Sequence, residues 1–144
     1  MTYNQVIKRI TELLQSHAMI KTVKTDPPAE WLMKETQPEY PLACFWIDNG
    51  TFNPGREQSY IINFFFLDKS DIENRIADDV ISDMISVAYD IVEKMRLGSN
   101  GYFIDDAVNF QTISDKYEDY LGGCSMVINL TAQSEFNACN FVNV

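Results

Sequence analysis

The sequence predicts an α+β domain, in which an antiparallel sheet of about four strands (two hairpins) packs against a long central helix and an N-terminal helix. Apolar residues recur at intervals of three and four over residues 72–97, which is the period of an amphipathic helix. Two apolar, aromatic-rich runs precede this segment and two longer runs follow it. A chain of 144 residues can bury a sizeable core, so residues 1–144 are expected to form a single domain.

Both predicted helices carry signals at their ends. The first is expected over residues 2–17 and the central one over Ile72–Leu97. Thr2–Gln5 and Ser70–Glu73 each fit a capping box, in which two side chains satisfy early backbone N–H groups. Gly98 follows the last periodic residue, where glycine adopts a left-handed backbone at little cost. Each helix therefore has a recognisable start in the sequence.

The first hairpin is predicted from two strands, Leu42–Ile47 and Tyr60–Leu67, which are apolar at nearly every position. Asp48–Ser59 between them is rich in turn residues and is expected to be a long exposed loop. Residues 19–25 form a short β-leaning run. Residues 26–41 hold four of the five prolines and are expected to be a connector within the domain.

The second hairpin is predicted from residues 108–121 and 124–141, joined by a turn at Gly122-Gly123. In its last strand, apolar residues at even positions from Met126 to Ala132 alternate with mostly polar ones, which predicts one buried face. The register stays open, because a strict two-residue turn would place Asp119 opposite Met126.

Two helices can cover only one face of such a sheet, yet the first hairpin is apolar on both faces. Trp46 and Phe65 are examples of side chains expected on the uncovered face. Monomeric proteins rarely expose a patch of this kind, so self-assembly or a partner is expected. Residues 137–144 carry no charge and include Phe141, and this tail is also expected to dock against another surface.

The chain is strongly acidic, with 21 Asp and Glu residues against 11 Lys and Arg residues and a formal charge of −10. Sequence-independent binding of nucleic acid needs a basic surface and is therefore not expected. Cys44, Cys124 and Cys139 lie in apolar runs and are expected to be buried free thiols in a reducing cytosol. The N-terminus lacks signal-peptide features and no apolar run has membrane-spanning length, so no membrane association is expected.

No catalytic motif, phosphate-binding loop or cofactor signature is present, and the chain is not expected to be an enzyme or to hold a metal. His17, the single histidine, is expected to cap carbonyls at the end of the first helix. One alternative remains a small metal-dependent hydrolase or nuclease that uses Asp105, Asp106, Asp115 and Glu118. Another is an adaptor that binds an apolar peptide on the open sheet face.

The order of elements resembles the tail-terminator (tail-completion) and head–tail joining proteins of tailed bacteriophages. The segments His17–Val23, Tyr40–Ala43 and Tyr60–Asp68 carry the resemblance, which spans most of the chain and rests on pattern, without a diagnostic motif. It implies a structural virion protein of the neck or tail, made in the bacterial host cytoplasm, without enzymatic activity. It also implies a homo-oligomeric ring of six or twelve subunits between the connector and the tail.

The resemblance further implies which residues make contacts. The hairpin segment Thr51–Gln58 would reach a neighbouring subunit or the tail tube. Phage connector or adaptor proteins and tail proteins would be the partners, and DNA would pass through the lumen without specific binding. The acidic charge would then repel DNA phosphates, so that the genome slides freely. The expected interface residues are Phe52, Asn53, Pro54, Arg56, Glu57, Trp46, Phe65 and Phe141.

Overall fold

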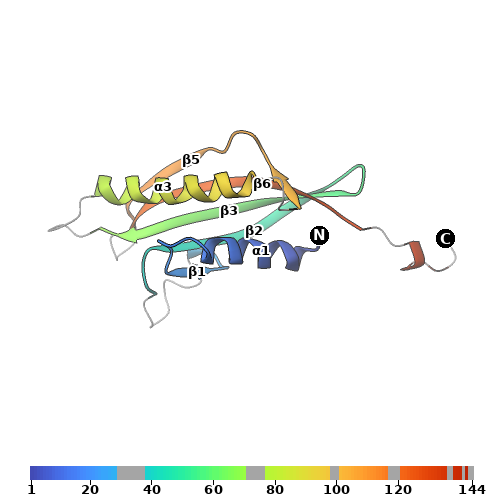
Figure 1. The fold of residues 1–144 in the computed structure, drawn as a ribbon, viewed down its shortest axis with the longest axis horizontal. Helices are drawn as coiled ribbons and strands as arrows, with labels where there is room; N and C mark the ends of the chain where they lie inside the picture. The colour runs from blue at the N-terminus through green and yellow to red at the C-terminus, as the bar shows by residue number, and fades with distance from the viewer. Residues whose placement is uncertain are drawn as a thin grey trace.

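The computed structural model describes residues 1–28, 38–70, 77–97, 101–116, 121–135, 138–140 and 142 (Figure 1). Within these ranges the chain forms two α-helices and one mixed six-stranded sheet that does not close on itself. The prediction of an α+β fold is therefore confirmed. The predicted cap at Ser70–Glu73 and the predicted helix end at Gly98 lie outside the described residues.

The first helix, α1 (Tyr3–Gln15), begins as its sequence predicts. The Thr2 hydroxyl accepts the Gln5 backbone N–H at 3.2 Å, and the Gln5 side-chain oxygen accepts the Thr2 N–H at 2.8 Å. This is the reciprocal pairing of a capping box. Three apolar side chains of α1 are buried in the core: Val6, Ile10 and Leu14.

The second helix, α3 (Ala77–Met95), is shorter in the described residues than the predicted 72–97 and buries most of the apolar positions predicted within its bounds. It lies over β3, β5 and β6, whereas α1 contacts β1 (Figure 1). Side chains of both helices belong to one core cluster with alternate residues of the sheet, so both helices cover the same face. The buried residues of α3 are Val80, Met84, Val87, Ala88, Ile91, Val92 and Met95.

The sheet has more strands than the sequence predicts. Its order is β1-β2-β3-β6-β4. β5 also pairs with β6, along a different stretch of that strand from β4. β1 runs parallel to β2, and the other pairs are antiparallel. The prediction of about four antiparallel strands is wrong. β1, which lies within the β-leaning run of residues 19–25, adds a parallel strand, and β4 is a further strand of only three residues, too short to show a period. The strands are β1 (Thr22–Lys24), β2 (Leu42–Asn53), β3 (Glu57–Lys69), β4 (Tyr102–Ile104), β5 (Phe110–Lys116) and β6 (Leu121–Gln133).

β2 and β3 form one long hairpin. Their pairing runs from Leu42 opposite Leu67 to Asn53 opposite Glu57, with one register shift between Ile47 and Asn49. The long loop predicted for the connection is therefore wrong, since only Pro54–Arg56 lie between the strands. Polar and turn-forming residues are tolerated in the outer half of β2 because that half is exposed, and an exposed strand needs no apolar pattern.

The two glycines predicted as a turn lie inside β6. Gly123 pairs with Leu67 of β3, and Gly122 pairs with the next residue of that strand. A Cβ atom at Gly123 would lie 1.9 Å from the Phe66 carbonyl oxygen, so the close approach of two strands requires glycine here. β6 ends at Gln133, earlier than predicted. Its predicted alternation is confirmed, with four side chains buried: Met126, Ile128, Leu130 and Ala132.

The strand packing at Gly123 makes a stability prediction. Gly123→Ala should lower the free energy of unfolding by about 3 kcal/mol, because the new methyl group meets backbone that cannot move without breaking the sheet. At Gly122 the nearest atoms to an added Cβ are 3.4 Å away, so Gly122→Ala is the matched control and should cost less than about 1 kcal/mol. Urea denaturation measures both values, and equal losses would contradict this account of Gly123.

Candidate interaction surface

The β2–β3 hairpin projects beyond the ends of both helices (Figure 1). Its turn contains two successive residues with left-handed backbone, Gly55 with φ 78° and Arg56 with φ 61°. The Arg56 carbonyl accepts the Ser134 N–H at 2.6 Å, which ties the turn to the chain after β6. Beside this turn, the Phe52 side chain is 87% exposed. The hairpin thus holds an aromatic ring in solvent on a braced backbone.

Polar side chains brace the base of this turn. The Asn53 amide donates to the Ser59 hydroxyl at 2.7 Å, and the Ser59 and Thr131 hydroxyls are hydrogen-bonded at 3.0 Å. The Gln133 amide donates to the Glu57 carboxylate at 3.3 Å. These bonds join β2, β3 and β6 across the hairpin. Because Ser59 and Thr131 are buried, the bonds compete little with water, and they stabilise one orientation of the tip.

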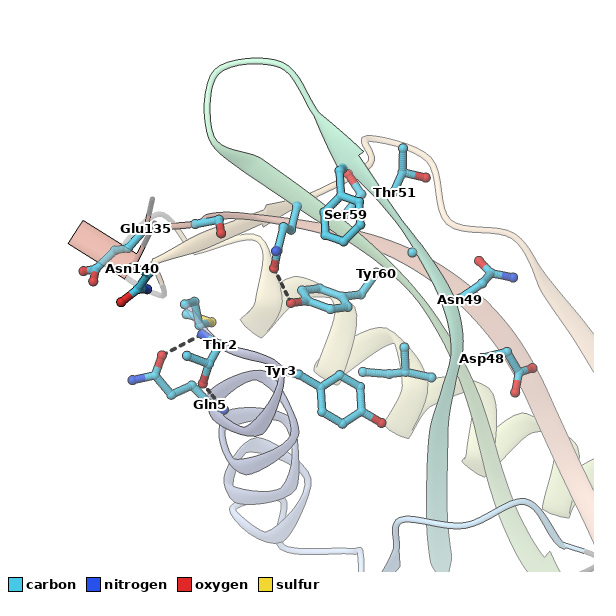
Figure 2. A pocket seen from close by; sticks show the side chains of 16 residues that line it. Thr2, Tyr3, Gln5, Asp48, Asn49, Thr51, Ser59, Tyr60, Glu135 and Asn140 are labelled. Carbon is cyan, nitrogen blue, oxygen red and sulfur yellow. Dashed lines mark hydrogen bonds between the residues drawn. The ribbon is translucent and has the colours of Figure 1, made fainter. Parts of the chain in front are cut away.

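A hollow of about 830 Å³ lies between this hairpin, the start of α1 and the residues after β6 (Figure 2). The Tyr3 and Tyr60 rings both line it, with centroids 6.2 Å apart and planes tilted by 57°. The Tyr60 hydroxyl donates to the Gln58 side chain at 2.6 Å. Burial, and to a smaller degree the neighbouring Tyr3, raises the pKa of Tyr60 above its usual value of 10.0. The labelled residues that line the hollow carry hydroxyl, amide and carboxylate groups around these two aromatic rings (Figure 2).

The sheet face opposite the helices is only partly open. A second, smaller core lies on it, and Trp46 and Phe65 pack against this core with their rings edge to face at 5.3 Å. Both side chains are partly buried, so the prediction of a broadly exposed face is too strong. Farther along, Val127 is 54% exposed and Phe103 is 59% exposed. The buried members of the smaller core are Leu42, Cys44, Leu67, Ile113 and Leu121.

A groove that the sequence does not predict separates α3 from β5. It encloses about 200 Å³. Tyr89 of α3 is 63% exposed and Phe110 of β5 is 54% exposed at its rim. Sequence reasoning misses it because the two aromatic residues become neighbours only when α3 packs beside β5. Its other lining residues are Ile85, Ala88, Val92, Arg96, Val108 and Met126.

The predicted interface residues fall in two places. Five of them lie together at the hairpin tip: Phe52, Asn53, Pro54, Arg56 and Glu57. Trp46 and Phe65 lie on the opposite sheet face and contact each other. Phe141 lies outside the described residues. Nearby Val142 is 80% exposed, and residues 138–140 are exposed as well.

The residues considered for metal-dependent chemistry are not brought together where the structure describes them. Asp105 and Asp106 are exposed in the link between β4 and β5. The Asp115 side chain and Glu118 lie outside the described part of the chain. Among the described residues, no three His, Cys, Asp or Glu side chains lie close enough to hold a metal ion.

The single histidine joins the two helices instead of capping carbonyls. Its Nδ1 accepts the Met19 N–H at 3.1 Å, so Nε2 carries the hydrogen and donates to the Asp90 carboxylate of α3 at 2.9 Å. The predicted capping role of His17 is therefore wrong. The bond links the residues that follow α1 to the outer face of α3, which makes it a structural contact.

Two of the three cysteines match their prediction. Cys44 and Cys124 are buried free thiols, and burial raises the pKa of Cys124 from 9.0 to about 12. Cys139 is exposed in a short 3-10 helix, η1 (Ala138–Asn140), so the prediction of a buried thiol is wrong there. Residues 138–140 form this helix where the sequence predicts a strand.

This difference predicts thiol reactivity. In native protein at pH 8, Cys139 should react with Ellman's reagent in the fast phase, whereas Cys44 and Cys124 should react only after denaturation. Burial keeps reagent from both, and the raised pKa of Cys124 also keeps it protonated at this pH. Cys139→Ser should remove the fast phase. A fast phase that survives this substitution would show that a strand thiol is accessible.

No helix among the described residues combines the length and apolarity needed to cross a lipid bilayer. No known family model matches this chain. No curated protein matches it either.

Proposed function

We propose that this chain is a structural ring protein of a tailed bacteriophage, placed at the head–tail junction or tail end. It joins the connector to the tail and lets DNA pass. The observation that carries this proposal is the projecting β2–β3 hairpin, which holds an 87% exposed aromatic ring on a braced backbone. A fixed, exposed apolar side chain is typical of a contact with another protein.

Other features support assembly. Exposed apolar side chains occur on separate sides of the molecule: on the hairpin, on the sheet face opposite the helices, and beside α3. Partly exposed Trp46 and Phe65 would be covered further by a neighbouring subunit, whose sheet would lie beside this one. The order of elements and the segments that resemble tail-terminator proteins point to the same kind of assembly.

The charge distribution suits a passage for DNA. Over residues 78–96, which span most of α3 and the residue after it, five exposed carboxylates outnumber the two cations: Asp78, Asp79, Asp83, Asp90 and Glu93 against Lys94 and Arg96. A lumen lined by such a surface would repel phosphates, so the duplex would slide without binding. Basic or neutral lumen walls in an assembled ring would remove this part of the proposal.

The tip variant Phe52→Ala/Arg56→Ala tests the proposal. It should weaken self-association at least tenfold and leave the melting temperature nearly unchanged, because Phe52 makes little contact with its own chain. Sedimentation velocity and thermal melts of the same samples measure the two effects. Lys8→Ala/Met19→Ala is the control, since it also removes one exposed cation and one exposed apolar side chain, from another surface.

Negative-stain imaging of the wild type should show rings. A wild type that sediments only as a monomer at the highest attainable concentration would overturn the proposed function. Equal losses of folding and of association in the tip variant would mean that the hairpin serves the fold and not the contact.

A further inference from the structure

A ring of more than two identical subunits needs two different contact surfaces on each subunit. Such a contact is head-to-tail: one surface of each copy binds another surface of the next, and the ring closes when the rotation permits. The inference below rests on the proposed function, because it asks which two surfaces meet. One surface should project, and the other should receive it.

The hairpin tip has the properties of the projecting surface. Phe52 is the most exposed of the large apolar side chains in the described residues, at 87%. The bond from the Ser134 N–H to Arg56 and the bond from Asn53 to Ser59 hold the turn, so little conformational entropy is lost on binding. The tip extends away from α3 and β5, so it cannot reach the groove of its own chain (Figure 1).

The groove between α3 and β5 has the properties of the receiving surface. Its volume of about 200 Å³ suits a single aromatic side chain. Ala88 and Val92 form an apolar wall, and the half-exposed rings of Tyr89 and Phe110 stand at the rim. An entering ring would cover both rims and make aromatic contacts, which are worth roughly 0.5–1.5 kcal/mol beyond the buried area.

Charge favours the same pairing. Two copies with a formal charge of −10 each repel one another unless opposite charges meet at their contact. Arg56 brings a cation to the tip. The outer face of α3 carries further exposed carboxylates, among them Asp78, Asp79 and Asp83, so the helix that forms one side of the groove is acidic. The Arg96 guanidinium at the groove donates to the Glu93 carboxylate at 2.7 Å and to the Asp106 carbonyl, so this ion pair adds little net charge of either sign.

We propose that Phe52 of one subunit inserts into the α3–β5 groove of the next, with Arg56 against the acidic surface of α3. The receiving residues are Tyr89, Phe110, Val92 and Ala88. The partner is a second copy of this chain, and the contact is head-to-tail.

Mixing two defective variants tests this contact directly. The tip variant Phe52→Ala/Arg56→Ala keeps an intact groove, and the groove variant Tyr89→Ala/Phe110→Ala keeps an intact tip. Each alone should be monomeric at concentrations where the wild type assembles. Mixed in equal amounts, they should form one-to-one dimers and nothing larger, because only one competent contact can form per pair. Native mass spectrometry resolves these species, and Met19→Ala/Lys8→Ala copies mixed with wild type are the control for continued ring growth.

Disulfide trapping gives a second measurement that does not depend on losing a contact. In a Cys139→Ser background, Pro54→Cys with Ser86→Cys should yield a ladder of covalent oligomers under an added mild oxidant, because both positions are exposed and both Phe52 and Tyr89 are kept. Pro54→Cys with Lys8→Cys, on the exposed face of α1, should not. Assembly of the groove variant at the wild-type concentration, or a mixture that stays monomeric while the wild type forms rings, would overturn this contact alone. A monomeric wild type would instead remove the proposed function and this inference with it.

Discussion

The fold depends on the continuous pairing of β3 with both of its neighbours. Every residue from Glu57 to Lys69 has a partner on β6, and nearly the whole strand also pairs with β2. This central ladder is longer than the layer of helices that covers it, so part of the sheet extends beyond the core (Figure 1). The extension is stable without a helix because three paired strands, polar side-chain bonds and one backbone bond hold it. The surface features discussed above follow from this mismatch in length.

Local chemistry explains the parts of the fold that the sequence predicts. The apolar period of α3 and the capping box of α1 are encoded by residues close together in the chain, so no tertiary information is needed. The outer half of β2 escapes prediction because its residues are exposed and carry turn-forming types. Gly122 and Gly123 are predicted as a turn because a glycine pair is typical of one. In the structure, glycine is needed at position 123 because the Phe66 carbonyl of another strand lies too close for a side chain.

The candidate surface is predictable only where its residues are neighbours in sequence. Phe52 and Arg56 share one turn, so their joint exposure follows from the hairpin itself. Trp46 and Phe65 were expected to be open, but a small core that includes Ile113 and Leu121 packs beside them, and its formation depends on the placement of β5 and β6. The groove at Tyr89 and Phe110, and the bond between His17 and Asp90, join segments far apart in the chain. The spacing of apolar residues within one segment does not predict contacts between distant segments.

The bond from Ser134 to Arg56 uses only main-chain atoms, as does the left-handed geometry at Gly55. The shape of the turn is therefore largely independent of which side chain stands at position 52 or 56. Such a scaffold lets mutation alter what the protrusion recognises without cost to the body that carries it. Related chains could diverge in partner choice through a few substitutions at this turn while the sheet and helices stay the same.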